Sequence, residues 1–395
     1  MAAEKAEAVV EEASSLSEPV EEYDEAALHS LLRLANLQLN PILTAAILES
    51  YSYAPQALFE ASDEELSNIP NLSLRHLNRV RDEQFLPSIS QLRWLEESDH
   101  AILWIGHPDY PGALKEIYDP PAMLFIRGCL LEQDRFGIGI VGSRQATPYG
   151  RSVAERMARE LSGYKLTLVS GGALGIDAAV HLGAIEGNGR TVAVLGCGVD
   201  VDYPRGHRSL YNRISSHGAL ISEYAPGTAP EPWRFPARNR IISGMTQGLL
   251  VVEAPQSSGA LITARFAVDQ GRTVMAIPGN IDRPASVGTN QLIKEGALAI
   301  TETADILQAL GMVALPAVQA ELDFDEIGIS EFMPNSGVSK EQKSLLALLS
   351  LTPIHLDAIA KNSGLSVNHV GTELTLLELA GLVRRLPGNT YIRIL

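Results

Sequence analysis

The chain has 395 residues, of which 46% are hydrophobic, so it can form two or three domains with a sizeable core. Its two cysteines are too few for a disulfide framework or a thiolate zinc cluster, and they suit a reducing cytoplasm. No run of about 18 apolar residues occurs, so we expect no membrane-spanning helix.

The net charge of −16 argues against a nucleic-acid partner, but the acidic residues are unevenly distributed. Residues 1–25 contain nine acidic residues and one lysine, a net charge of −8, so half of the total lies in one terminal segment. Residues 140–300 contain 16 Lys and Arg against 12 Asp and Glu, a net charge of +4. Because a local basic groove matters more for binding than the total charge, the central region is compatible with an anionic ligand.

The N-terminal part of the chain is predicted to be an acidic tail followed by a small helical bundle. Residues 1–24 have the composition of a solvated, disordered tail. In residues 25–88, Ser62 and Glu65 are spaced as a capping box, and Ile69–Ser73 has the composition of a turn between two helices. Helical spacing is clearest for Leu28, Leu31, Leu32 and Leu34.

Residues 89–312 alternate short apolar runs with amphipathic stretches such as Val153–Leu161 and Ala178–Glu186. This alternation indicates an α/β fold with a mostly parallel, doubly wound sheet. The runs predicted as strands are Ile102–Ile105, Met123–Arg127, Ile138–Val141, Thr167–Val169, Thr191–Leu195, Ala219–Ile221, Leu249–Glu253 and Thr273–Ala276.

The C-terminal part is predicted to be a linker and a winged helix. Residues 313–337 show little periodicity and are interpreted as the linker. Residues 338–395 contain three helical segments followed by a hairpin, which is the order of a winged helix. The helices are Leu345–Ser350, Leu356–Asn362 and Val367–Ala380, and the hairpin strands are Val383–Leu386 and Tyr391–Ile394.

Four segments after predicted strands carry the chemistry, and the carboxyl ends of parallel strands meet at the ligand-binding edge of such a sheet. In the first segment, Gly142 permits a tight turn, Ser143 can cap the following helix, and Arg144 can bind a phosphate. Free backbone N–H groups at the same edge add donors for an anion.

The second segment is the glycine-rich loop Ser170–Asp177, which precedes a helix. Its glycines let a nucleic-acid backbone approach closely, and a helix N-terminus attracts anions. Asp177 lies four residues before His181, so it either braces the loop or forms an acid–base pair with that histidine. The candidate binding residues are Ser170, Gly171, Gly172, Ala173, Gly175 and Asp177.

The third segment, Trp233–Arg240, is predicted to be a proline-containing loop with three arginines and two aromatic residues. Arginine neutralises phosphates, and an aromatic ring stacks on an unpaired base whatever its identity. In the alternative interpretation, Phe235 belongs to the core and Arg240 forms a bridge to an acidic residue. The candidate binding residues are Arg234, Phe235, Arg238, Asn239 and Arg240.

The fourth segment follows the strand that ends near Glu253 and contains Ser257, Ser258 and Gly259 before another helix. These residues offer hydroxyl and amide donors to a phosphate. Together the four segments predict a protein that binds a phosphate backbone.

Other chemistry is not indicated by the sequence. No P-loop and no His-Glu-x-x-His metal motif occurs, and Gly137–Gly142 places two glycines before or inside the strand, which is wrong for a dinucleotide site. Cys197 reads as a small buried side chain rather than a nucleophile. We therefore expect no catalytic residue, no metal site and no cofactor.

Several short runs of this chain are together typical of one family. The runs are Val141–Arg144 with Tyr149 and Gly150, Ser170–Asp177 with His181, Tyr203 and Pro204, Ser222 and Glu223, Phe235–Arg240, Val252–Ala254, Ser258–Thr263 and Ile277–Gly279. On these runs the central region, roughly residues 100–300, resembles the DNA-processing protein A family (DprA, also called Smf).

The resemblance implies a protein that is not an enzyme. Such a protein binds single-stranded DNA during natural transformation, protects it, and loads the RecA recombinase. It implies a homodimer formed through a Rossmann-like domain, here residues 89–312. That domain lies between a SAM or helix-hairpin-helix-like domain at 25–88 and the winged helix at 338–395. It also implies that Arg144 holds a phosphate and that Phe235 stacks a base near Arg238 and Arg240.

Two alternatives belong to other classes. One is a nucleotide-processing enzyme of the phosphoribohydrolase (lysine-decarboxylase-like) type, with Glu253 as general acid or base, although the Pro-Gly-Gly-x-Gly-Thr run of that family is missing. The other is a transcription regulator that uses the winged helix. The predicted recognition helix carries Glu373 and Glu378 and no Lys or Arg, which favours a protein contact over duplex binding.

Overall fold

The computed structural model describes residues 25–312, 340–349, 354–379, 382–386 and 390–393, and the predicted tail (1–24) and linker (313–337) lie outside them. The chain divides into two compact units, Met1–Val318 and Gln319–Leu395, each of which is described by itself. None of the described helices is long and apolar enough to cross a lipid bilayer.

Short helices open the first unit. The predicted capping box begins α5: the Ser62 N–H donates to Glu65 Oε2 over 2.7 Å, and the Glu65 N–H donates to Ser62 Oγ over 3.2 Å. Leu31, Leu32 and Leu34 are buried on α2, as their spacing predicts. The helices are α2 (Glu25–Asn36), α3 (Pro41–Ser50), α4 (Pro55–Glu60), α5 (Asp63–Ser67), α6 (Leu74–Arg81) and α7 (Ile89–Leu95).

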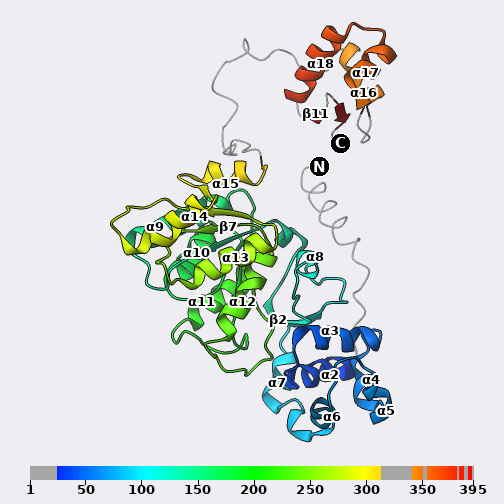
Figure 1. Ribbon diagram of the computed structural model, residues 1–395, viewed down its shortest axis with the longest axis vertical. Helices are drawn as coiled ribbons and strands as arrows, with labels where there is room; N and C mark the ends of the chain where they lie inside the picture. The colour runs from blue at the N-terminus through cyan, green and yellow to red at the C-terminus, as the bar shows by residue number, and fades with distance from the viewer. Residues whose placement is uncertain (1–24, 313–339, 350–353, 380–381, 387–389, 394–395) are drawn as a thin grey trace, which may run out of the picture. The chain divides into compact units, whose positions relative to one another are not determined.

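A β-sheet forms the centre of this unit (Figure 1). It has nine strands in the order β1-β2-β6-β5-β4-β3-β7-β8-β9. β2 pairs antiparallel with β1 and β6, and all other pairs are parallel. This confirms the predicted mostly parallel, doubly wound sheet. The strands are β1 (His100–Trp104), β2 (Met123–Gly128), β3 (Gly137–Val141), β4 (Leu168–Ser170), β5 (Thr191–Leu195), β6 (Gly218–Ser222), β7 (Thr246–Val251), β8 (Thr273–Ala276) and β9 (Leu298–Ala299).

Helices cover both faces of the sheet. Along β5, Val192 and Val194 join the apolar cluster of α12 (Arg234–Gly244) and α13 (Gly259–Asp269), whereas Ala193 and Leu195 join the cluster on the opposite face. This alternation follows from the two-residue period of a strand. The opposite face is covered by α9 (Pro148–Ser162), α10 (Ile176–Glu186), α11 (Arg208–His217) and α15 (Thr303–Ala309).

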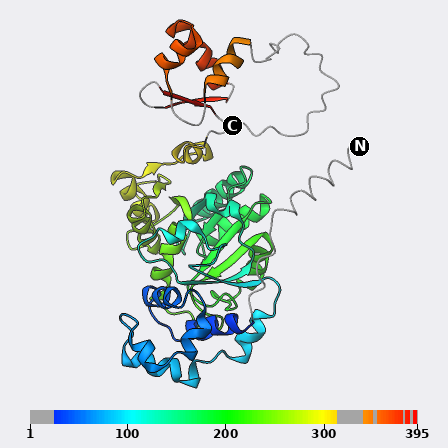
Figure 2. The same ribbon diagram turned by 90° about the vertical axis from the view of Figure 1, so that its right-hand side faces the viewer.

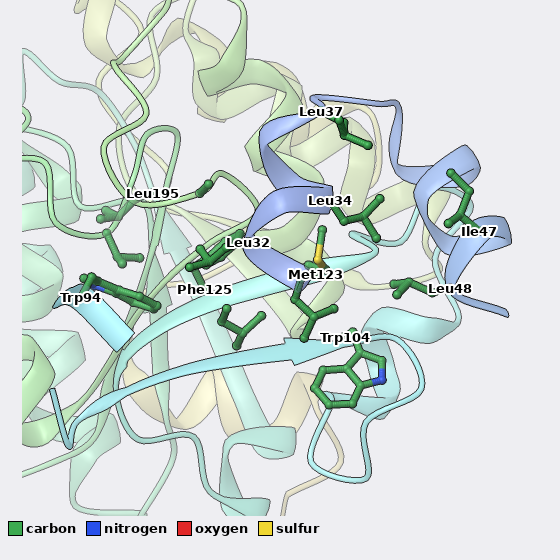
Figure 3. Packing of buried hydrophobic residues seen from close by; sticks show 14 of the residues in the cluster. Leu32, Leu34, Leu37, Ile47, Leu48, Trp94, Trp104, Met123, Phe125 and Leu195 are labelled. Carbon is green, nitrogen blue, oxygen red and sulfur yellow. The ribbon is translucent and has the colours of Figure 1, made fainter. Parts of the chain in front are cut away.

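The N-terminal helices (blue) lie beside the sheet (green) in Figure 2. In Figure 3, Leu32 and Leu34 of α2 lie close to Met123 and Phe125 of β2. Phe125 is completely buried, and burial of a side chain of this size contributes about 1.5–3 kcal/mol. The helical segment therefore shares one continuous apolar core with the sheet.

From strand β3 the sheet extends in two opposite directions. It has β4 on one side and β7 on the other. The helix after β3 is α9, which covers one face, and the helix after β7 is α13, which covers the other. Because these connections diverge, a crevice opens at the carboxyl ends of β3 and β7, where ligands bind in open α/β sheets.

The second unit confirms the predicted winged-helix order of three helices and a hairpin. Its three-stranded sheet has the order β10-β12-β11, and Leu345, Ile359, Leu374 and Tyr391 are buried in its core. β10 was not predicted, because two residues give no periodic signal. The elements are α16 (Lys340–Leu348), β10 (Ile354–His355), α17 (Leu356–Ser363), α18 (Val367–Leu379), β11 (Val383–Leu386) and β12 (Thr390–Arg393).

Candidate nucleic-acid interface

A groove of about 670 Å³ lies at the carboxyl ends of β3 and β7. Its walls come from all four predicted segments, which the fold therefore brings together, and from Tyr203 after β5. The lining includes Gly142, Ser143, Arg144, Ala173, Asp177, Tyr203, Phe235, Arg238, Asn239, Ser258 and Gly259.

Arg144 stands at the edge of this groove with an exposed side chain. Its guanidinium carbon is 5.2 Å from the centroid of the Phe235 ring, and it forms no ion pair with any part of the chain that the structure describes. A cation that lies over an aromatic ring and remains exposed to solvent can bind a phosphate.

Ser143 does not cap the next helix, which corrects the prediction. Thr147 is the N-cap of α9, and its hydroxyl accepts from the Gly150 N–H over 3.1 Å. The Ser143 hydroxyl instead accepts from the Gln145 N–H over 3.1 Å. The loop after β3 runs on for several residues before the helix starts, so the cap falls later in the chain.

The glycine-rich loop fits closely against the loop after β3. Gly175 has a φ of 84°, and a Cβ at this position would lie 2.3 Å from the carbonyl oxygen of Ser143. The Ile176 N–H donates to that same oxygen over 3.2 Å. The N–H of the exposed Leu174 donates to no acceptor among the described residues, so it stays available to an anion, whereas Gly172 is buried.

Ser170 is completely buried, and its hydroxyl donates to the Ile140 carbonyl over 2.7 Å. It ties β4 to β3 and is not exposed to a ligand. This corrects the prediction that Ser170 contacts a nucleic-acid backbone directly.

The floor of the groove consists of Asp177, Arg238 and the glycine-rich loop that both side chains contact. The Asp177 carboxylate accepts from the Ala173 N–H over 3.3 Å, so it braces the loop. Burial raises the pKa of Asp177, while the nearby Arg238 charge opposes that shift. Arg238 donates to the carbonyls of Gly171, over 2.6 Å, and Val194, and burial lowers its pKa. A Cβ on Gly171 would lie 2.6 Å from Asp177 Oδ2, so glycine lets this close arrangement form.

His181 is also completely buried, on the same helix as Asp177. Its Nδ1 is 2.7 Å from Thr191 Oγ1, and burial lowers its pKa to about 3. A histidine held neutral and bonded to a threonine is not arranged as the partner of an acid–base pair with Asp177.

The third segment is a helix, not a loop, because α12 begins at Arg234. Pro236 lies in the first turn, where its missing N–H is not needed, so the proline does not prevent a helix. Helical spacing then divides the segment between two faces. Phe235, Arg238, Asn239 and Ile242 line the groove, whereas Arg234, Ala237 and Arg240 line a separate pocket of about 420 Å³.

The prediction that Arg234 and Arg240 bind the ligand in this groove is therefore wrong, because neither side chain faces it. Arg240 is 5% exposed, and its Nη2 is 2.7 Å from Glu223 Oε2. Its Nε is 3.2 Å from Asp119 Oδ2. Arg234 is 6% exposed and donates to the carbonyl of Ala229. The bridge between Arg240 and an acidic residue is the alternative that the sequence had left open.

Phe235 is half-buried and remains accessible from the groove. Its ring centroid is 5.2 Å from that of Tyr203, with 32° between the ring planes. Sequence reasoning did not include Tyr203 among the binding residues. The available signal was an aromatic residue soon after the predicted strand Thr191–Leu195, at the same edge as the four segments.

Ser258 is the N-cap of α13, and its hydroxyl accepts from the Ala260 N–H over 3.3 Å. The Gly259 carbonyl accepts from Asn239 over 3.3 Å, which joins the fourth segment to α12. Ser257 is exposed but does not line the groove.

Groups that could serve catalysis are occupied by the fold. Both oxygens of Glu253 are held by Thr147: the hydroxyl donates over 2.6 Å and the N–H over 2.9 Å. Cys197 is 1% exposed, and burial raises its pKa to about 11, so its thiol stays protonated. Within the described residues, no group of three or more His, Cys, Asp or Glu side chains could hold a metal ion.

Comparison with known proteins identifies the family. The family model described as DNA recombination-mediator protein A matches residues 101–311, and the DprA winged helix domain matches residues 332–389. The Smf protein of Escherichia coli is 38% identical over 327 residues, which is 82% of this chain and 85% of that protein. The DNA processing protein DprA of Bacillus subtilis is 42% identical over 231 residues, 58% of this chain and 77% of that protein. The solved structure of DNA processing protein A from Streptococcus pneumoniae, 35% identical, gives a TM-score of 0.61 and covers 70% of this chain and 96% of that one. The chain belongs to the DNA recombination-mediator protein A (DprA) family.

Proposed function

We propose that the groove binds single-stranded DNA and that the protein is a recombination mediator. In this role it protects incoming single strands and loads the RecA recombinase during natural transformation and homologous recombination. The observation that carries the proposal is the exposed guanidinium of Arg144 over the accessible ring of Phe235. One group neutralises a phosphate and the other stacks on a base, so the pair suits adjacent parts of one nucleotide strand.

The geometry favours an unpaired strand over a duplex. The Phe235 ring lies inside the groove beside Tyr203, so a base must leave its helical stack to reach it. Neither the ring nor the backbone N–H of Leu174 distinguishes one base from another, which supports binding with little sequence preference.

The proposal includes no catalytic step. Glu253, the residue that a nucleotide-hydrolysing enzyme would use at this strand end, has both carboxylate oxygens committed to Thr147. We also propose that the protein acts as a homodimer in the cytoplasm. The recombination-mediator role is supported by the family model that matches residues 101–311.

The test is a fluorescence-anisotropy titration of a labelled oligothymidylate, in parallel with a duplex, at low and high salt. We expect tighter binding of the single strand and an affinity that falls as salt rises. Arg144→Met removes one phosphate contact, so it should weaken binding to every sequence and reduce the slope of log K against log salt by about 0.7.

Arg135→Met is the matched control, because Arg135 precedes β3 and therefore lies at the opposite edge of the sheet. It is exposed and pairs with Glu132 over 2.7 Å. It should leave affinity and salt slope unchanged. Equal weakening by the two variants would refute the assignment of the site, and the absence of single-strand binding by the unmodified protein would refute the function.

A further inference from the structure

A second groove adjoins the first at the same edge of the sheet. Its volume is about 1010 Å³, and it lies at the carboxyl ends of β3, β7 and β8. Ser143, Gln145 and Pro255 line both grooves, so they form a ridge with one groove on each side. The remaining walls come from residues 147–149, Glu253, residues 278–280 and residues 283–286. Apart from Ser143 of the first predicted segment and Glu253 and Pro255 of the fourth, these residues lie outside the four predicted segments.

The second groove contains an aromatic ring and a guanidinium that the fold does not use. Tyr149 is 58% exposed, and its ring meets no other ring or cation among the described residues. Arg283 is exposed, and its guanidinium has no ion pair or hydrogen bond in the part of the chain that the structure describes. Neither side chain therefore makes a contact of these kinds that would give it a structural role, and both are available to a ligand.

The acidic groups near Arg283 leave its charge available. Glu253 lines the groove, but both of its oxygens accept hydrogen bonds from Thr147. Asp282 is exposed beside Arg283 in the chain and does not line the groove, and its N–H donates to Asn280 Oδ1 over 2.9 Å. An anion in the groove therefore meets one unpaired cation.

The two grooves repeat the same chemistry on either side of the ridge. The first offers Arg144 and Phe235, and the second offers Arg283 and Tyr149. A phosphodiester strand carries a negative charge and a flat base at every residue, so a strand long enough to cross the ridge can use both pairs. A compact ligand such as a single nucleotide can use only one.

We infer that a single-stranded nucleic acid continues from the first groove over the Ser143–Pro255 ridge into the second, where Tyr149 stacks a base and Arg283 neutralises a phosphate. The inference rests on the proposed function, because it extends the same binding path. It adds a subsite that matters only for longer strands.

The experiment compares two oligothymidylates, of about 5 and about 15 nucleotides, by anisotropy titration of the full chain. The double variant Tyr149→Ala/Arg283→Met should bind the longer strand about tenfold more weakly and the shorter strand within about twofold of the unmodified protein. Arg144→Met should weaken both strands. The matched control is Tyr164→Ala/Arg135→Met, which removes an exposed ring and an exposed charge from the opposite edge of the sheet.

The outcomes separate this inference from the proposed function. If the unmodified protein binds neither strand, the function fails and the inference fails with it. If it binds both, but the Tyr149/Arg283 variant matches the unmodified protein on the longer strand, only the inference fails. Loss of the shorter strand as well would show that these residues do not form a separate subsite. A changed sedimentation coefficient of the DNA-free variant would assign the groove to a second copy of this chain and also overturn the inference.

Discussion

The rim and the floor of the first groove contain similar side chains in opposite states. At the rim, Arg144 and Tyr203 are exposed and Phe235 is half-buried. On the floor, Arg238 is 3% exposed and Asp177 is 7% exposed. The guanidinium at the rim has no ion pair among the described residues, whereas the one on the floor donates to two backbone carbonyls.

This contrast shows that an arginine in a motif can serve the ligand or the fold. A buried charge is costly unless it is hydrogen-bonded and compensated, so Arg238 must be satisfied by Gly171, Val194 and the nearby Asp177 before any ligand arrives. An exposed charge has no such requirement. We therefore assign binding to the rim and the positioning of the glycine-rich loop to the floor.

The largest expected effect is on stability, from Arg238→Met. The substitution removes two hydrogen bonds and leaves Asp177 buried without its nearby cation, so the free energy of unfolding should fall by about 3–5 kcal/mol. Urea denaturation measures this change. Arg144→Met removes the same charge at the rim and should change stability by no more than about 0.5 kcal/mol. Equal destabilisation by the two variants would contradict the division into rim and floor.

The next effect is a pH dependence that comes from His181, which is buried on the same helix as Asp177. The pKa of His181 is about 3 in the folded chain and near 6.5 when exposed, so the neutral histidine contributes stability above pH 6.5. That contribution is lost as the pH falls from 6.5 towards 3. Between about pH 7 and pH 4.5, the unmodified protein should lose roughly 2–3 kcal/mol more than His181→Leu. Parallel urea titrations of the two proteins measure these losses. Equal losses would show that protonation of His181 does not cause the loss of stability in acid.

The sequence was sufficient for the sheet because its signals are local. Short apolar runs such as Thr191–Leu195 gave every strand of the large sheet except β9, whose two exposed residues carry no pattern. Glycines and small polar residues after those runs located the loops at one edge, since that edge follows from parallel strands alone.

The sequence was insufficient for the division between rim and floor. The arginines at 234, 238 and 240 look alike in a linear motif, and only the helical geometry of α12 separates the face towards the groove from the face towards Glu223. Ser170 likewise has the composition of a ligand contact, but its hydroxyl donates to Ile140 on the neighbouring strand. Tyr203 was missed because its neighbour Phe235 is 32 residues away in the chain.

A smaller effect is expected on binding, from Phe235→Ala. Loss of one stacked base should weaken single-strand affinity by about 1–3 kcal/mol, or about 5- to 150-fold. Phe235→Trp keeps a flat ring in the groove and should retain most of the affinity. Anisotropy titration measures both variants, and thermal unfolding shows whether they remain folded. Equal loss in the tryptophan variant would mean that shape, rather than stacking, governs this position.

The smallest effect should come from Tyr203. Its ring packs on Phe235, with 5.2 Å between the centroids, and such a contact is worth about 0.5–1.5 kcal/mol. Tyr203→Ala should therefore weaken single-strand binding by only about 2- to 13-fold, and Tyr203→Phe should have no effect, since the ring and not the hydroxyl makes the contact.

A double-mutant cycle decides how Tyr203 acts. If it only orients the Phe235 ring, Tyr203→Ala should add nothing in a Phe235→Ala background. If it stacks a base of its own, the two losses should add. The first result would make Tyr203 part of the support for one aromatic contact. The second would extend the rim to two stacked bases and place the strand closer to β5.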